Sequence, residues 1–152
     1  MTQPVYSCSI EDRANTAAQI MWEHDCGVVP VVDQGGHVVG VLTDRDLCMA
    51  AHFQNRPLTD IAIASVMAQQ VCTCLAEDDV VEAERLMAER QIHRLPVVSN
   101  DGSLIGILSL ADVARQAKGT TSGRRDDVVS QLANTVSAIS EPHRQNAGSR
   151  AH

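Results

Sequence analysis

The order of hydrophobic and polar residues predicts a hairpin held between two helices. Between residues 13 and 24 apolar side chains recur at the spacing of one helix face, whereas residues 28–32 and 38–42 are short β-branched runs typical of strands. A glycine-containing turn joins the two runs as a hairpin. The elements expected in this part of the chain are, in order, a short strand near residues 5–7, a helix over 13–24, strands over 28–32 and 38–42, and a helix from Asp44 to about His52.

The same pattern returns 66 positions later without a gap. Pairs that align at this offset include Pro30 and Pro96, Gly36 and Gly102, Gly40 and Gly106, and Asp46 and Asp112. The second set of expected elements is a strand near 71–74, a helix over 80–90, strands over 95–98 and 104–108, and a helix from Leu110 to about Lys118. Each unit is therefore β-α-β-β-α. Because one such unit cannot cover its apolar sheet face, we expect a mixed α/β (α+β) fold in which the two units pack by pseudo-twofold symmetry.

The repeat divides the chain into three parts. Residues 1–56 hold the first repeat, residues 57–118 hold the second repeat with a lead-in linker predicted as a short helix, and residues 119–152 form a C-terminal extension that is partly helical or disordered. Within the extension, residues 126–139 place apolar side chains on one face, which predicts an amphipathic helix. We expect Pro142 to end this helix and residues 143–152 to be a frayed end.

Composition and charge exclude several classes of function. Hydrophobic residues make up 44% of the chain and aromatic residues 2%, which indicates an aliphatic globular core. A net charge of −7 with one lysine, Lys118, disfavours nucleic acid and anionic membranes as partners, because both require clustered basic residues. No long apolar run and no basic start before an apolar stretch predict a membrane span or a secretory signal, so we expect a cytoplasmic protein.

The end of each hairpin carries residues that resemble a known family. Both repeats read Gly-apolar-apolar-Thr/Ser-x-x-Asp, once from Gly40 to Asp46 and once from Gly106 to Asp112, and each motif follows a Pro-Val-Val strand. Two such motifs in register resemble a pair of CBS domains, the cystathionine-β-synthase-type repeat, also called a Bateman module. The resemblance covers residues 5–117. It implies a regulatory module that senses a ligand, and the sequence shows no catalytic set of residues, so we expect no enzymatic activity.

The resemblance also implies a ligand, an adenine nucleotide such as AMP, ADP or ATP, bound in two clefts. In the family, the hydroxyl and carboxylate of the motif contact the ribose, and residues 91–97 are similar to a phosphate-holding segment in the γ subunit of AMP-activated kinase. The ligand-binding residues expected on this basis are Thr43, Asp46, Ser109, Asp112, His93, Arg94, Arg45, Val28, Val29 and Thr73. An NAD-type dinucleotide or S-adenosylmethionine remains an alternative ligand.

The same motif has a structural interpretation. A hydroxyl at the end of a strand with an acid three residues later is typical of a capping box at the start of a helix, and such a helix end also offers free N–H groups to a phosphate. The two clefts are not equivalent in sequence, because residues 27–28 are Gly-Val where residues 93–94 are His-Arg.

The cysteines support a second hypothesis from another class of function. Cys48 and His52 are four residues apart on a predicted helix, and Cys72 and Cys74 are two apart on a predicted strand, so each pair shares a face that suits zinc binding, and two thiols could also form a regulatory disulfide. Neither pair forms a complete four-ligand pattern, so no metal ligand and no obligatory cofactor is assigned. Buried free cysteines are the simpler interpretation.

Two protein partners are expected. Apolar helix positions in both repeats, namely Met21, Trp22, Leu86 and Met87, exceed what the chain can cover, which predicts a homodimer. A sensor without a catalytic part also implies an effector protein, which the sequence does not identify.

Overall fold

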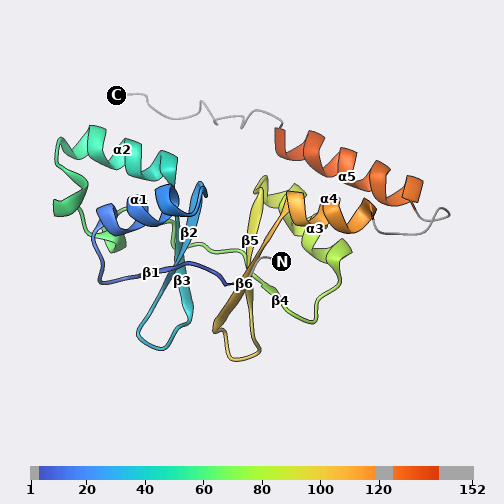
Figure 1. The fold of residues 1–152 in the computed structure, drawn as a ribbon, viewed down its shortest axis with the longest axis horizontal. Helices are drawn as coiled ribbons and strands as arrows, with labels where there is room; N and C mark the ends of the chain where they lie inside the picture. The colour runs from blue at the N-terminus through green and yellow to red at the C-terminus, as the bar shows by residue number, and fades with distance from the viewer. Residues whose placement is uncertain (1–3, 119–124, 141–152) are drawn as a thin grey trace, which may run out of the picture.

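The computed structural model describes residues 4–118 and 125–140, and it contains two similar units (Figure 1). Unit 1 consists of β1 (Cys8–Ser9), α1 (Ala14–Glu23), β2 (Val28–Val32), β3 (Val38–Thr43) and α2 (Asp44–Gln54). Unit 2 consists of β4 (Cys74–Leu75), α3 (Val80–Arg90), β5 (Arg94–Val98), β6 (Leu104–Ser109) and α4 (Leu110–Lys118). The predicted β-α-β-β-α order and the mixed fold class are confirmed.

Each unit has one three-stranded sheet, in which the first strand is parallel and the third antiparallel to the middle strand. The first strands begin later than predicted, because the register places Cys8 opposite Val31 and Cys74 opposite Val97. One residue earlier, each first strand would face Pro30 or Pro96. Proline has no N–H to donate to a ladder, so regular pairing stops there.

The two sheets join through the tips of their hairpins. The N–H of Val38 donates to the carbonyl of Gly102 at 3.4 Å, and the N–H of Leu104 donates to the carbonyl of Gly36 at 3.0 Å. Both glycines have positive φ, 81° and 86°, which favours glycine at these turns. Because each hairpin donates to the other in the same way, the pseudo-twofold relation predicted from the repeat is built into the backbone.

The lead-in linker forms two short 3₁₀ turns, η1 (Leu58–Asp60) and η2 (Ile63–Ser65), where one helix was expected. Ile61 and Ile63 are 1% and 0% exposed and belong to the core of unit 1. The N–H of Ile63 also donates to the carbonyl of Asp12. The linker therefore packs into unit 1, although the sequence grouped it with the second repeat.

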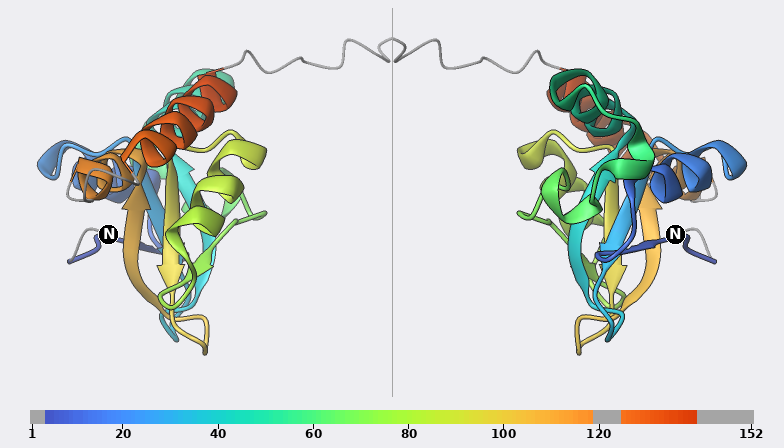
Figure 2. Two further views of the ribbon diagram at one scale, coloured as in Figure 1. Left: turned by 90° about the vertical axis from the view of Figure 1, so that its right-hand side faces the viewer. Right: turned by 90° about the vertical axis from the view of Figure 1, so that its left-hand side faces the viewer.

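Beyond unit 2, α5 (Arg125–Ser140) is present close to the predicted range 126–139 and packs against α3 and α4 (Figure 2). Its Ile139 is 6% exposed and belongs to the core of unit 2. The predicted end at Pro142, the tail 143–152 and residues 119–124 lie outside the described residues. Among the described helices, none combines the length and the apolar character needed to cross a membrane.

The helix positions expected to form a dimer interface lie partly in the interior. Met21 and Met87 are 7% and 0% exposed and belong to the cores of their units, because they occupy equivalent positions on the inner faces of α1 and α3. Leu86 is half-buried against the core of unit 2, whereas Trp22 is 88% exposed. Of these positions, both methionines are therefore inaccessible to a partner, whereas the tryptophan is accessible.

Candidate functional site

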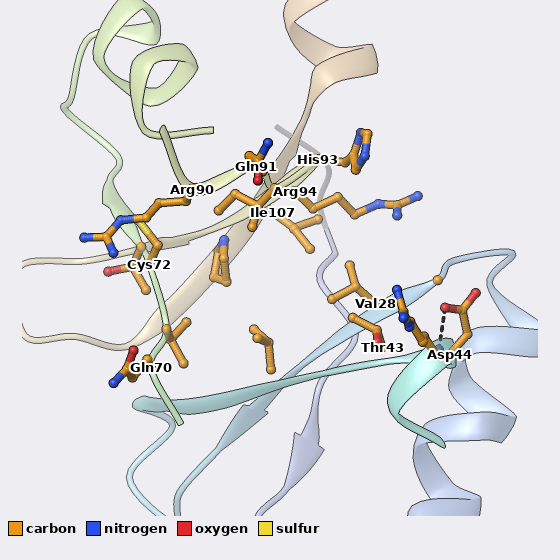
Figure 3. Close-up of a pocket in the computed structure, with 17 residues that line it drawn as sticks. Val28, Thr43, Asp44, Gln70, Cys72, Arg90, Gln91, His93, Arg94 and Ile107 are labelled. Atoms are coloured by element: carbon orange, nitrogen blue, oxygen red, sulfur yellow. Dashed lines mark hydrogen bonds between the residues drawn. The ribbon is translucent and has the colours of Figure 1, made fainter. Parts of the chain in front are cut away.

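A cleft of about 1010 Å³ lies between the two units (Figure 3). We call it the inter-unit cleft. Unit 1 contributes Gly27, Val28, Val41 and residues 43–45, and the other side is formed by residues 70–73, residues 90–94, Pro96 and Ile107. The cleft therefore contains the N-terminus of α2, the segment before β4 and the turn that connects α3 to β5.

Four basic side chains line the inter-unit cleft. Arg45 comes from the first turn of α2, Arg90 ends α3, and His93 and Arg94 lie at the start of β5. All four are exposed. Figure 3 shows Arg94 extending toward the wall that carries Asp44, while Arg90 lies on the side of the cleft that carries Cys72 and Gln70. The basic groups are thus spread along the cleft, with one carboxylate, Asp44, among its lining residues.

Gly27 keeps the space between Asp44 and Arg94 open. A β-carbon at this position would lie 3.2 Å from Oδ2 of Asp44 and 3.9 Å from Nη1 of Arg94. Any larger side chain would enter the region where the two charged groups face the cleft. Its repeat equivalent, His93, carries a side chain, so the two sides of the cleft differ where the units meet.

Both motifs form helix caps. Oδ2 of Asp46 accepts hydrogen bonds from the N–H of Thr43 at 2.9 Å and from its hydroxyl at 2.6 Å, and the N–H of Asp46 donates to the Thr43 hydroxyl at 3.2 Å. Ser109 and Asp112 repeat this arrangement at 2.9, 2.7 and 3.2 Å. The capping interpretation is therefore confirmed for both motifs, and any ribose contact has to coexist with the cap.

The N–H groups at the start of α2 already have partners. The N–H of Asp44 donates to the carbonyl of Gly27 at 3.2 Å, that of Arg45 to Oδ1 of Asp44 at 2.7 Å, and that of Asp46 to Thr43. The expectation that this helix end offers free N–H groups to a phosphate is therefore wrong. Basic side chains are the groups of the cleft that are suited to an anion.

The structure brings together six of the predicted ligand-binding residues in the inter-unit cleft and places four outside its lining. Those that line it are Val28, Thr43, Arg45, Thr73, His93 and Arg94. Asp46, Ser109 and Asp112 are not among the lining residues, and neither is Val29, which is 0% exposed. Alternation along β2 explains the last result, since it turns Val28 to the cleft and Val29 to the core.

Several lining residues were not predicted, chiefly Asp44, Gln70 and Arg90. Gln91 begins the segment 91–97 that resembles a phosphate-holding sequence, and Arg90 directly precedes it, so the end of the predicted helix was the signal for Arg90. Asp44 lies between the two residues of the motif that drew attention, Thr43 and Asp46.

The repeat equivalent of the inter-unit cleft has a different chemistry. At the positions of Arg90 and Arg45 it has His24 and Ala111, and Tyr6 stands for Cys72. The pairs Gly27–Val28 and His93–Arg94 line the inter-unit cleft together, from its two sides. The Tyr6 and His24 rings are stacked.

Asp112 in the second motif is also more fully engaged than Asp46. Its Oδ1 accepts a hydrogen bond from Arg115, while its Oδ2 accepts from Ser109. Burial by itself would raise the pKa of Asp112, but the hydrogen bonds from Ser109 and Arg115 outweigh burial and lower it below the usual value. Asp112 therefore remains ionised and is committed to the protein through both oxygens.

The thiols have different environments. Burial, with the nearby charge of Asp12, raises the pKa of Cys8 to about 12, and burial, with Asp78, raises that of its repeat equivalent Cys74 to about 11. Cys72 is half-buried in the cleft wall, and Cys48 is exposed on α2. Across the described residues, no group of three or more His, Cys, Asp or Glu side chains is arranged to hold a metal ion.

Comparison with known proteins places these features in context. The chain is 35% identical over 114 residues to the CBS domain-containing protein YhcV of Bacillus subtilis, with 75% of this chain and 79% of that protein covered. It is 35% identical over 109 residues to an uncharacterized protein of Methanopyrus kandleri, of which it spans 56%.

Two solved structures have the same fold. Hypoxic Response Protein I with two coordinated zinc ions is 29% identical with a TM-score of 0.69, covering 76% of this chain and 92% of that chain. CBSX2 in complex with AMP is 27% identical with a TM-score of 0.67, covering 77% of this chain and 90% of that chain.

The family profile of the CBS domain matches residues 1–52 and 63–119, which correspond to the two units of the structure. The repeat, the paired caps and these matches agree: the chain belongs to the CBS domain family.

Proposed function

We propose that this protein is a non-catalytic sensor that binds an adenine nucleotide in the inter-unit cleft. The observation that carries the proposal is the convergence of Arg45, Arg90, His93 and Arg94 from both units on one cleft. A cleft with several basic groups and aliphatic walls suits a ligand with an anionic end and an apolar base. The AMP complex of CBSX2, a structure with the same fold, supports this choice of ligand.

The charge of the cleft favours phosphate over other adenosyl ligands. Guanidinium groups bind phosphate oxygens through paired, charge-assisted hydrogen bonds. S-adenosylmethionine carries a sulfonium cation instead, which three arginines and one aspartate, Asp44, would repel on balance. AMP, ADP and ATP are therefore preferred, and the phosphates are assigned to the end of the cleft near Arg94 and Arg45.

The base and ribose take the remaining lining residues. Val28 and Ile107 offer aliphatic surface to an adenine from the two sides of the cleft, and Thr73 lies on the same side as Ile107. A contact between Asp46 and the ribose hydroxyls remains a prediction. In the described part of the chain, the hydrogen bonds to its carboxylate are at Oδ2, so a ribose hydroxyl would bind Oδ1. Asp44 is the carboxylate of the cleft lining and is a second acceptor for the same hydroxyls.

The signal would arise because the ligand contacts both units. Arg45 belongs to unit 1, whereas Arg94 belongs to unit 2, and bound phosphates would draw these two side chains together. A ligand shifts a conformational equilibrium only by its differential affinity for the two states. Contacts that span two units provide such a difference.

Assembly is part of the proposal. Trp22 on α1 and Phe53 on α2 are 88% and 76% exposed, and Met49 on α2 is 38% exposed. Aromatic side chains exposed to this extent on neighbouring helices mark an interaction surface. We assign it to a second copy of this chain, because an isologous twofold dimer is the commonest closed assembly.

Calorimetric titration of the purified protein with AMP, ADP and ATP tests the ligand. Arg94→Ala should weaken nucleotide binding by about 1.5–3 kcal/mol, the contribution of a hydrogen bond to a charged group. Arg85→Ala is the matched control. It removes the same charge from unit 2, but Arg85 pairs with Glu82 and Glu89 on the outer surface of α3. Binding of none of the three nucleotides, or equal loss in both variants, would overturn the proposal.

A further inference from the structure

The turn that ends α3 has contacts on two sides. Gln91 lines the inter-unit cleft between Arg90 and residues 92–94, and its side-chain Nε2 donates a hydrogen bond to the carbonyl of Ala138 in α5 at 3.1 Å. One residue therefore belongs both to the wall of the candidate site and to the contact that holds the C-terminal helix.

The backbone of this turn is fixed by the fold. Gln91 has φ 53°, in the left-handed region, and its N–H caps α3 by donating to the carbonyl of Ala88. Its repeat equivalent, Asp25, has φ 48°, so both units share this turn. The two units differ in the contact that this turn makes: in unit 2 the Gln91 side chain reaches the neighbouring helix α5.

The end of α5 docks on unit 2 through buried side chains. Ile139 is 6% exposed and belongs to the core of unit 2, and Thr135, one turn earlier, is 5% exposed. Val136, between them, is 45% exposed. The Gln91 hydrogen bond to Ala138 lies beside the buried Ile139, so the polar and apolar contacts form one docking point.

We propose that cleft occupancy and the docking of α5 on unit 2 are coupled through Gln91, so that α5 is the element that transmits the bound state. This inference rests on the proposed function. Phosphates held by Arg94, three residues after Gln91, would fix the segment that follows the turn. A fixed turn presents the Gln91 amide to Ala138 with less loss of conformational freedom, which makes the coupling positive. An effector that recognises docked or released α5 would then respond to the nucleotide.

Linkage makes the proposal quantitative. If the nucleotide stabilises docked α5 by some factor, docked α5 raises the affinity for the nucleotide by the same factor. The contribution of one hydrogen bond corresponds to a factor of about two to ten. Weakening the docking of α5 from its own side, away from the cleft, should therefore weaken nucleotide binding.

The test uses the full chain and the tightest binder among AMP, ADP and ATP. Ile139→Ala should lower its affinity about two- to tenfold, while Val136→Ala, a truncation on the exposed face of the same helix, should leave affinity unchanged. Hydrogen exchange at residues 133–140 should slow on adding nucleotide to the wild-type protein by a similar factor. Circular dichroism melts establish that both variants fold.

Gln91→Met separates coupling from a direct contact, because methionine keeps the length of the side chain and lacks the amide donor. If Gln91 acts through α5, Gln91→Met lowers affinity in the wild-type background and has no further effect in Ile139→Ala. An equal loss in both backgrounds, or unchanged exchange at 133–140 with nucleotide bound, would overturn the coupling while leaving the proposed function intact. Absence of nucleotide binding in the wild-type protein would overturn the proposed function and the coupling with it.

Discussion

The phenol ring of Tyr6 lies flat against the imidazole of His24, with the ring centroids 3.3 Å apart and the planes inclined by 7°. These two residues are the repeat equivalents of Cys72 and Arg90, which line the inter-unit cleft. The fold therefore places a stacked ring pair where the other side of the pseudo-twofold axis has an arginine and a cysteine. Internal symmetry of the backbone is combined with asymmetric chemistry.

This asymmetry predicts one phosphate-bearing nucleotide per chain. The second position has His24 and Ala111 where the inter-unit cleft has Arg90 and Arg45, so a phosphate would lose two guanidinium contacts there. Calorimetry should give a stoichiometry near one, and Arg94→Ala should weaken that single site. Two sites of similar affinity per chain would contradict this prediction.

A second prediction concerns recognition of the ribose. If Asp46 contacts ribose hydroxyls, the wild-type protein should bind ADP more tightly than its 2′,3′-dideoxy analogue, by about 1.5–3 kcal/mol for a charged hydrogen bond. Asp46→Asn should remove most of that preference, because an amide oxygen is a weaker acceptor than a carboxylate. Asp44→Asn is the matched comparison, since Asp44 lines the cleft and Asp46 does not.

Each outcome assigns the contact to a residue. Loss of the preference in Asp44→Asn and not in Asp46→Asn would move the ribose contact to Asp44 and leave Asp46 as a cap only. An unchanged preference in both variants would remove both carboxylates from ribose binding. Unfolding in urea should show Asp46→Asn to be less stable without ligand, because the cap loses its charged acceptor.

The repeat explains why most of the fold was predictable. The two repeats align without gaps at an offset of 66 residues, so each helix and strand of the unit was predicted twice, from two different sequences. The first strands were the exception. The start of each first strand depends on its register against the middle strand. The residues before Cys8 and Cys74 would face Pro30 and Pro96, and the pairing begins only after these prolines. The linker also depended on tertiary context, since Ile61 and Ile63 fit the core of unit 1.

The candidate site was less predictable, because motif positions do not reveal which side chain faces a cleft. Val28 and Val29 are adjacent and chemically alike, and alternation along β2 separates them. Asp46 attracted attention as part of a motif, whereas Asp44, two residues earlier, is the acid that lines the cleft. The sequence likewise does not reveal that the N–H groups at the start of α2 donate to the Gly27 carbonyl and to the Asp44 carboxylate.

The third prediction tests assembly. Trp22→Glu or Phe53→Glu should convert a dimer to a monomer in light scattering at tens of micromolar protein, because a buried unpaired carboxylate strongly disfavours an interface. Val81→Glu is the control: it places the same charge at a 53% exposed aliphatic position on α3, in the other unit. A monomeric wild-type protein, with and without nucleotide, would contradict the prediction.

The fourth prediction concerns the thiols and separates the sensor from its redox- or metal-responsive alternative. Cys8 and Cys74 are 1% and 6% exposed with pKa values raised to about 12 and about 11, so their thiolates are disfavoured in the folded state. Iodoacetamide at pH 8 should modify exposed Cys48 first and leave Cys8 and Cys74 unmodified until the protein unfolds. Stoichiometric zinc in the purified protein, or early modification of Cys74, would favour the alternative.

The raised pKa values also predict how stability depends on pH. Above the ordinary thiol pKa of 9.0, the unfolded chain loses the protons of Cys8 and Cys74 while the folded chain retains them until about pH 11 to 12. Stability contributed by the neutral thiols is therefore complete below pH 9 and declines above it, by up to about 1.4 kcal/mol per pH unit for each thiol. Urea unfolding at pH 8.0 and 9.5 should show this decline in the wild-type protein, and the Cys8→Ala and Cys74→Ala double variant should show a smaller one. An equal decline in both proteins would mean that other groups carry the pH dependence and that the two thiols ionise as readily in the folded state as in the unfolded chain.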